Sequence, residues 1–317
     1  TFYEDQEKNI WIGTHKGIYV FSLSKKKVVK HYNTLNCQLP ENLVRSIAQD
    51  DKGRFWIGTF GGGIGVYTTQ MQLIKKFYQY EGFCSNTINS IYLSKSKQVW
   101  VATGEGLVCF PTSDSFDYQI FQREEGLPNT HIRAITEDEN SNIWVSTNTG
   151  ISCYIIAQKR FYNYDHFNNI PQGNFMSGCV TKNNDGVIYF GSINGLCFFT
   201  PDIAMSKLET PPVVITEMKI FERLETTKNN EIFIPILEKG EVELTHTQSS
   251  FSLTFNIQDY SLVNQVEYTY MLKGLDKLWY VVNENNSVTF RNIPPGKYEV
   301  LIKARVHNQE WPEEATS

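Results

Sequence analysis

Residues 54–67 read RFWIGTFGGGIGVY, and the glycines Gly61, Gly62, Gly63 and Gly65 decide how this stretch is interpreted. Glycine-rich loops that bind phosphate place backbone N–H groups against the anion and lead into a helix N-terminus. Here apolar and aromatic residues lie on both sides of the glycines, which indicates two strands and no helix. A tight turn between antiparallel strands needs the same glycines, because they adopt positive φ readily. The stretch therefore predicts a β-hairpin and not a nucleotide-binding loop.

The pattern around this hairpin recurs along the chain with a period of about 44 residues. Four of the six tryptophans are spaced by 45, 44 and 44 residues, and the next step of 45 reaches a tyrosine. A Thr or Ser lies three residues after each of these anchors, and a glycine lies six residues after each. In the opening stretch this glycine is Gly62. The anchor residues of the five repeats are Trp11, Trp56, Trp100, Trp144 and Tyr189.

Each repeat contains four short segments rich in β-branched and aromatic residues, bounded by Gly, Asp and Asn clusters. Four strands in a period of roughly 40–50 residues are typical of a β-propeller blade. We therefore predict an all-β chain in which residues 1–205 form five four-stranded blades, as part of a larger seven-bladed propeller. The fifth repeat lacks an obvious fourth strand, so we expect further N-terminal sequence to supply it. The anchors are expected to be buried wedges between neighbouring blades.

The repeat stops near Pro201, and Pro211 and Pro212 mark a linker. Residues 206–317 then alternate between apolar and polar residues in segments such as SSFSLTFNIQ and KYEVLIKARV, joined by turns such as IPPGKY. This pattern predicts an immunoglobulin-like β-sandwich. We expect Tyr268, Tyr270 and Tyr298 to pack within it, with ligand stacking as the alternative.

Composition and motifs exclude several kinds of site. A net charge of −5 provides no basic face, so this segment is not expected to contact nucleic acid. No run of 18 apolar residues is present that would span a bilayer. The six cysteines form no CxxC pair or Cys/His metal spacing, and we interpret them as buried free thiols in preference to disulfides. Acidic segments such as QDDKG and EDENSN lack the calcium-loop pattern and predict β-turns, so we expect no metal and no cofactor.

Phase within the repeat singles out three polar residues. Arg45, Asn89 and Arg133 each lie eleven residues before their tryptophan, where the innermost strand begins, and Met176 is the nearest counterpart in the fifth repeat. Innermost strands surround a propeller's axis, so these residues are expected to ring one mouth of its channel. Their donors suit glycan recognition, and arginine can bind an acidic sugar in bidentate fashion. The alternative is that the arginines cap loop carbonyls or pair with Glu41, Glu124 or Glu125.

Two longer segments, LPENLVRSIAQDDKGRFWIGTFGGGIGVY and GLPNTHIRAITEDENSNIWVSTNTGISCY, closely resemble the two-component regulator propeller repeat. The segments VEYTYMLKGLDKLWYVV and VTFRNIPPGKYEVLIKARV resemble the Y_Y_Y domain, which is named for its tyrosines. Repeats followed by this domain are similar to the periplasmic sensor region of hybrid two-component systems. Such systems abound in gut bacteria that degrade polysaccharides.

The resemblance implies a non-enzymatic, periplasmic segment of an inner-membrane sensor histidine kinase. Its ligand would be an oligosaccharide, and binding would shift a homodimer formed through the sensor region. A membrane helix outside this segment would carry the shift to kinase, receiver and DNA-binding domains that control polysaccharide-utilisation genes. Two alternatives remain: a protein-interaction scaffold, and a glycoside hydrolase or lyase. A glycosidase would need two carboxylates about 5–10 Å apart, and the sequence singles out no catalytic pair.

Overall fold

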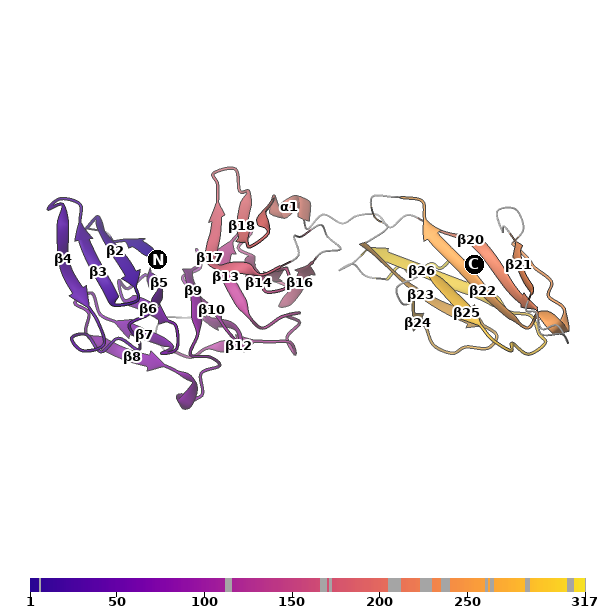
Figure 1. Cartoon of the computed structure of the whole chain (residues 1–317), viewed down its shortest axis with the longest axis horizontal. Coiled ribbons are helices and arrows are strands. Elements are labelled where there is room, and N and C mark those ends of the chain that lie inside the picture. The colour runs from indigo at the N-terminus through magenta and orange to yellow at the C-terminus, as the bar shows by residue number, and fades with distance from the viewer. Residues whose placement is uncertain are drawn as a thin grey trace. The chain divides into compact units, whose positions relative to one another are not determined.

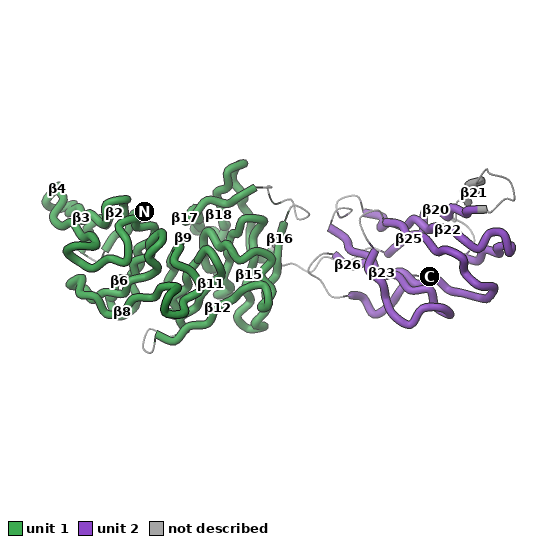
Figure 2. The backbone as a smooth tube through the Cα atoms, turned by 60° about the horizontal axis from the view of Figure 1, so that its bottom comes forward, with its two compact units in different colours: residues 1–205 green, residues 206–317 purple. Residues whose placement is uncertain are grey.

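The computed structural model describes residues 1–5, 7–111, 116–165, 170, 173–204, 212–222, 230–234, 240–259, 262, 265–282, 286–306 and 311–316. The chain divides into two compact units, residues 1–205 and 206–317 (Figure 2). Both units are built from antiparallel sheets, as the alternating sequence pattern predicts (Figure 1). The fold is therefore all-β, with propeller blades followed by a sandwich.

Unit 1 contains five sheets that follow one another along the chain, and within each sheet consecutive strands are neighbours. The first two sheets consist of β1 (Phe2–Glu4), β2 (Asn9–Thr14), β3 (Gly17–Ser22) and β4 (Lys27–Tyr32), then β5 (Val44–Gln49), β6 (Phe55–Thr59), β7 (Ile64–Tyr67) and β8 (Leu73–Phe77). A short 3-10 turn, η1 (Gln79–Glu81), follows. The next two sheets consist of β9 (Ile88–Leu93), β10 (Val99–Thr103), β11 (Gly106–Phe110) and β12 (Gln119–Phe121), then β13 (Ile132–Glu137), β14 (Ile143–Thr147), β15 (Ile151–Ile155) and β16 (Arg160–Tyr164).

The fifth sheet departs from the four-stranded prediction. Its described strands are β17 (Phe175–Lys182), β18 (Ile188–Ser192) and β19 (Gly195–Phe199), which precede the short helix α1 (Pro201–Ala204). The first four repeats are thus four-stranded blades, and the fifth is three-stranded within the described residues.

The opening stretch forms the hairpin between β6 and β7. The backbone N–H of Thr59 donates to the carbonyl oxygen of Gly63 at 3.0 Å, and Gly61 and Gly63 have φ of +98° and +78°. A Cβ added to Gly63 would lie 2.1 Å from the carbonyl oxygen of Phe77, the same clash that a Cβ on Gly17 would make in the first blade. The structural counterpart of the repeat glycine is therefore Gly63 and not Gly62, because this hairpin is one residue longer.

The anchor tryptophans are all buried, and each contacts the following sheet. The ring of Trp56 lies 4.9 Å from that of Phe110, and the ring of Trp144 lies 4.7 Å from that of Phe199. Tyr189 occupies the same register but is only half-buried, which corrects the prediction for the fifth anchor. No sheet follows it within the described part of unit 1, so its outer side lacks the cover that the tryptophans receive.

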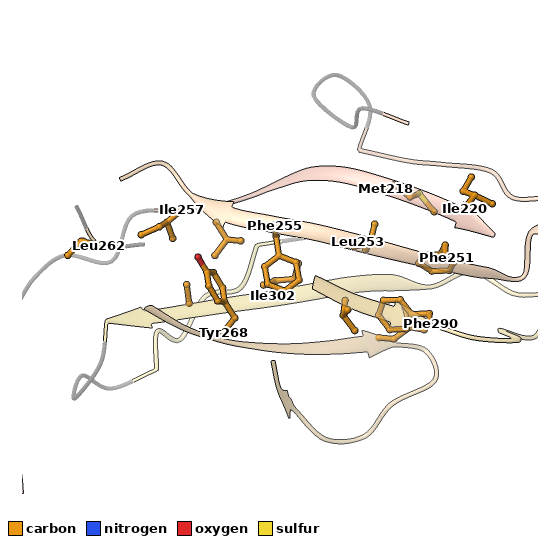
Figure 3. Close-up of a cluster of buried hydrophobic side chains, with 14 of the residues drawn as sticks. Met218, Ile220, Phe251, Leu253, Phe255, Ile257, Leu262, Tyr268, Phe290 and Ile302 are labelled. Carbon is orange, nitrogen blue, oxygen red and sulfur yellow. The ribbon is translucent and has the colours of Figure 1, made fainter. Parts of the chain in front are cut away.

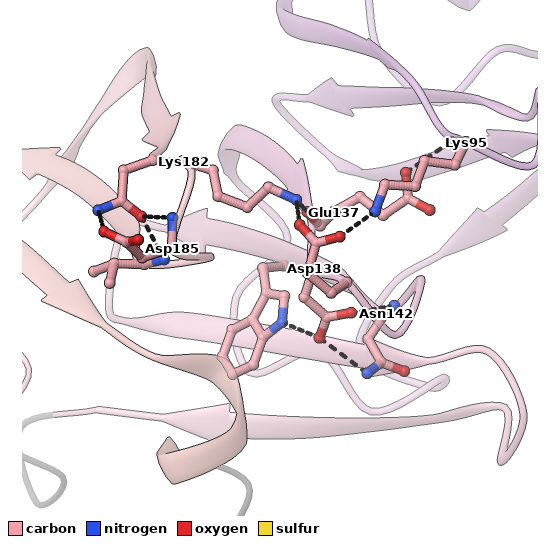
Figure 4. A network of polar contacts seen from close by, with 10 residues as sticks. Lys95, Glu137, Asp138, Asn142, Lys182 and Asp185 are labelled. Carbon is pink, nitrogen blue, oxygen red and sulfur yellow. Dashed lines mark hydrogen bonds and ion pairs between the residues drawn. The ribbon is translucent and has the colours of Figure 1, made fainter.

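In three of the four blades with an anchor tryptophan, an aspartate six residues earlier accepts a hydrogen bond from the indole N–H, a contact that we call the aspartate clasp. The indole N–H groups donate to Asp5, Asp50 and Asp138 at 2.8–2.9 Å. Figure 4 shows the contact at Asp138. The same carboxylates accept the backbone N–H four residues on, so the acidic segments form turns, as predicted. In the third blade Ser94 replaces the aspartate, and the buried Nε1 of Trp100 has no hydrogen-bond partner.

Unit 2 is a sandwich of two antiparallel sheets, with strand orders β21-β20-β22-β25 and β24-β23-β26. The strands are β20 (Val213–Glu222), β21 (Asn230–Ile234), β22 (Ser250–Ile257), β23 (Val266–Lys273), β24 (Tyr280–Val281), β25 (Ser287–Phe290) and β26 (Glu299–Val306), with a 3-10 turn η3 (His246–Gln248) before β22. Apolar side chains of both sheets meet in one core, with Phe255 and Ile302 fully buried (Figure 3).

The three tyrosines of unit 2 pack in or against its core, as predicted. Tyr268 is buried against Phe255, and Tyr270 packs partly buried against the same core. Tyr298 precedes β26, and its hydroxyl donates to the carbonyl oxygen of Pro294 at 3.0 Å.

All six cysteines are unpaired in the described residues, as predicted. Four of them are buried, whereas Cys84 is partly buried and Cys179 is exposed on β17, which corrects the expectation of burial for these two.

Candidate functional site at the inner strands of unit 1

A β-bulge places each of the three predicted site residues. In β5 the register shifts between Val44 and Ser46, so Arg45 is the extra residue; Asn89 in β9 and Arg133 in β13 occupy the same place in their strands. A bulged residue is left out of the ladder, and its side chain is turned away from the regular inward and outward alternation. The second, third and fourth blades therefore each aim one bulged side chain into the same pocket.

These side chains form one hydrogen-bonded chain across three blades. The Nη1 of Arg45 donates to Oδ1 of Asn89 at 2.9 Å, and the amide nitrogen of Asn89 donates to the carbonyl oxygen of Ile132 at 2.7 Å. Asn89 is only 1% exposed, so its amide is committed to these internal contacts. We assign it the role of positioning the neighbouring arginine.

The fifth repeat completes the chain through a residue that the sequence reasoning missed. The hydroxyl of Ser177 donates to Oδ1 of Asn89 at 3.1 Å, although the two residues are 88 positions apart. Nη1 of Arg133 lies 3.3 Å from Ser177 Oγ, and its Nε donates to Oδ1 of Asn148 at 2.7 Å. Ser177 was missed because β17 carries a larger register shift, between Phe175 and Val180, which moves it out of phase with the other repeats.

The three predicted residues line a single pocket of about 590 Å³. Its wall includes Thr14 and His15 from the first blade, and Met176, the predicted counterpart in the fifth, lies on its apolar side with Ile193. Because Met176 and Ile193 are 47% and 62% exposed, the lining includes exposed apolar surface. The pocket thus combines guanidinium donors with an apolar edge.

The electrostatics of the pocket are one-sided. No residue that lines it is Asp or Glu. Burial, and then the neighbouring Arg133, lower the pKa of Arg45, and burial lowers the pKa of Arg133. Burial, and then the charges of Arg133 and Arg45, lower the pKa of His131.

The alternative partners of the arginines are otherwise engaged or distant. Glu41 accepts the backbone N–H of Asn42 at 2.6 Å, and Glu125 accepts that of Gln122 at 2.7 Å. Among the described ion pairs, none joins Arg45 or Arg133 to a carboxylate, including Glu124. Both guanidinium groups are held by neutral oxygen atoms.

Other candidate chemistry is sparse in the described residues. They contain no group of three or more His, Cys, Asp or Glu side chains that could hold a metal ion. The carboxylate of Glu137 is buried, with Oε2 accepting the N–H of Lys95 at 2.7 Å and Oε1 unpaired, but it lies in the turn network shown in Figure 4 and away from the pocket lining. No helix in the described ranges is both long and apolar enough to cross a bilayer.

Comparison with known families matches both units. The two component regulator propeller family matches residues 38–61 and 126–149, and the Y_Y_Y domain family matches residues 259–317. The first propeller match includes Arg45 and Trp56, and the second includes Arg133 and Trp144.

Solved structures extend the similarity to the whole chain. The extracellular domain of a hybrid two component system from B. thetaiotaomicron is 69% identical with a TM-score of 0.93, covering 100% of this chain and 43% of that one. The extracellular domain of a one component system from the same organism is 20% identical with a TM-score of 0.51, which shows a shared fold.

A curated relative points in the same direction. Histidine kinase P4 from Formosa agariphila is 22% identical over 165 residues, which are 51% of this chain and 12% of that protein. The chain therefore spans less than half the length of the relatives that it matches. Parts of the chain thus match the two component regulator propeller family and then the Y_Y_Y domain family, and the whole chain is similar to the extracellular domain of a hybrid two component system.

Proposed function

We propose that this chain is the ligand-sensing, extracytoplasmic part of a hybrid histidine kinase and response regulator that detects a glycan fragment. The pocket lined by Arg45, Asn89 and Arg133 is the proposed sensing site. The observation that carries this proposal is that bulges in successive inner strands deliver these side chains to one cavity, in a chain similar to a sensor's extracellular domain. Bulges are common next to functional sites, where they re-aim side chains.

Signalling in this proposal depends on the rest of the protein. Ligand binding would change the arrangement of a homodimer, and a membrane helix outside residues 1–317 would transmit that change to the kinase. The segment would lie in the periplasm, tethered to the inner membrane, and the output would control polysaccharide-utilisation genes. A ligand shifts such an equilibrium only by its difference in affinity for the two arrangements.

A glycoside hydrolase fits this pocket less well. Glycosidases use two carboxyl groups on either side of the scissile bond, and no Asp or Glu lines the cavity. An interaction scaffold would use the same surface for a protein partner. These alternatives differ in what happens to an oligosaccharide that is mixed with the protein. A hydrolase cleaves it and releases products, a sensor binds it without cleaving it, and a scaffold neither binds nor cleaves it.

The test is isothermal titration calorimetry with a panel of neutral and acidic oligosaccharides. We expect at least one class to bind wild type without product release, and to bind the Arg45→Ala, Arg133→Ala double variant at least tenfold more weakly. Arg160→Ala, which removes an exposed arginine on β16, is the matched control and should keep wild-type affinity. Unchanged affinity in a folded double variant would remove this pocket from the sensing role.

A further inference from the structure

The pocket lined by Arg45, Asn89 and Arg133 holds two positive side chains and no carboxylate that would neutralise them. Arg45 and Arg133 are both half-buried, and the lining contains no Asp or Glu. The whole chain carries an excess of acidic residues, with a net charge of −5, so the acidic groups are placed elsewhere. Cations that are withdrawn from water are ordinarily paired, because burial without a counter-charge is costly.

We propose that this pocket binds an anionic group of the ligand, either the carboxylate of a uronic acid or a sulfate ester on a sugar. The inference rests on the proposed function, in which this pocket senses a glycan, and adds the chemical class of that glycan. Carboxylate and sulfate oxygens share the planar or forked acceptor geometry that guanidinium groups recognise.

The contacts of Arg45 orient its guanidinium without neutralising it. Nη1 donates to the amide oxygen of Asn89, where an aspartate of nearly the same shape would have formed an ion pair. The guanidinium carbon lies 4.3 Å from the centre of the Phe60 ring, a cation–π contact that covers part of the group but accepts no hydrogen bond from its edge. The remaining N–H groups of Arg45 have no described hydrogen-bond partner and are available to a ligand.

The contacts of Arg133 follow the same logic. Its Nε donates to the amide oxygen of Asn148 at 2.7 Å, and Nη1 lies 3.3 Å from the hydroxyl of Ser177. Both acceptors are neutral, so the positive charge is retained and the other terminal nitrogen is left without a described partner. A guanidinium that is already held in place loses little side-chain freedom when an anion binds.

The two arginines also act on each other. Both line one pocket, and Nη1 of Arg45 is linked to Nη1 of Arg133 through Asn89 Oδ1 and Ser177 Oγ, so the folded blades hold two like charges near each other. Burial, and then the charge of Arg133, lower the pKa of Arg45 accordingly. An anion between them would relieve this repulsion and form charge-assisted hydrogen bonds to both groups. A neutral sugar could accept hydrogen bonds there but would leave the two charges uncompensated.

The test compares sugars that differ only in charge. One pair is digalacturonic acid and its carboxyl-reduced counterpart, and the other is a sulfated disaccharide and its desulfated counterpart; calorimetry is run at low and high salt. We expect the charged member of at least one pair to bind at least tenfold more tightly, with a preference that weakens in salt. The pair that shows the preference distinguishes carboxylate from sulfate.

Variants assign the preference to the pocket. Arg45→Gln and Arg133→Gln keep hydrogen-bonding groups but remove the charge, and each should lower the charged-to-neutral ratio several-fold. The Arg45→Lys and Arg133→Lys variants keep the charge and should retain part of the preference. Arg160→Gln is the matched control, since Arg160 lies exposed on β16 beside Tyr162, and should leave the ratio unchanged.

A second measurement uses unmodified protein with labelled arginine, so it does not depend on whether a variant folds. Sulfate titration should shift the Nε–H NMR signals of Arg45 and Arg133 and leave that of Arg160 in place. Equal binding of charged and neutral sugars, lost in the Gln variants, would overturn the anionic inference and leave the glycan proposal standing. Sulfate shifts without any sugar binding would support the anion site and defeat the glycan proposal, whereas neither response would overturn both.

Discussion

The aspartate clasp of the fourth blade gives a prediction that can be worked out from the structure. Asp138 is 1% exposed and accepts hydrogen bonds from Trp144 Nε1 at 2.9 Å, the Asn142 backbone N–H at 2.8 Å and the Asn142 side-chain amide at 2.9 Å. The change Asp138→Ser copies the third blade, where the serine hydroxyl still accepts the equivalent backbone N–H at 3.0 Å but the indole is unpaired. The variant therefore loses the two side-chain bonds and keeps the turn.

The expected loss of stability is about 2 kcal/mol. A buried donor that loses its partner costs about 1–3 kcal/mol, and the second lost bond adds to this while removal of a buried charge offsets part of it. For a unit of this size the loss corresponds to a fall of roughly 4–8 °C in melting temperature. Urea unfolding followed by tryptophan fluorescence measures it, with calorimetry as a second readout.

Asp138→Asn is the control for charge, because its side-chain oxygen can still accept the indole N–H. We expect it to lose about half as much stability as the serine variant. If Asp138→Ser unfolds within about 0.5 kcal/mol of wild type, which is the range of ordinary surface changes, the clasp contributes no more than a neutral contact and the reasoning is wrong.

Three further predictions concern the same unit. Ser94→Asp should supply the missing clasp of the third blade and raise stability by about 1 kcal/mol in urea titration; a loss would mean that burying the carboxylate outweighs the new bond. Gly63→Ala should cost more than about 2 kcal/mol because its Cβ meets a carbonyl oxygen, whereas Gly61→Ala, with positive φ but open space, should cost about 1 kcal/mol, and equal losses would contradict this. Hydrogen bonds from two lysines lower the pKa of the exposed Glu139 to about 2, below its unfolded value, so its stabilising effect is present above about pH 4.3 and lost as the pH falls toward 2. The difference in urea midpoint between wild type and Glu139→Gln should shrink over that range, and a constant difference would refute the assignment.

The repeated architecture was predictable because the same packing problem is solved in each blade. A large wedge, a small residue beside it and a turn glycine must recur in phase, and they are visible as a period of about 44 residues. Gly13 and Gly58 show why the small residue is needed, since an added Cβ would come within 3 Å of Val44 and Ile88 in the following blade. Tyr189, the fifth anchor, lies in the expected register, but the spacing of residues in the sequence does not reveal how much of a side chain the next sheet buries.

The site was predictable only in part. Phase placed Arg45, Asn89 and Arg133 at the start of the inner strands, but the bulge that re-aims them changes the register by one residue and leaves no mark in the spacing. Ser177 joins them across 88 residues through an irregular strand, so no local pattern reveals it. The Asp–Trp clasp, in contrast, was visible as an aspartate six residues before three of the tryptophans, and was interpreted as a turn signal alone.

The bulges separate the residues that line the pocket from the residues that pack the blades together. Because Arg45 and Arg133 lie outside the strand ladder, and the wedge tryptophans hold the blades together from other positions, the bulged residues can be exchanged without rebuilding the packing. Arg45 and Arg133 thus give the cavity two side chains that can be varied while the packing between blades is kept. A short combinatorial library at these positions would sample many ligand chemistries on an unchanged frame, and a family of such receptors could diversify by the same route.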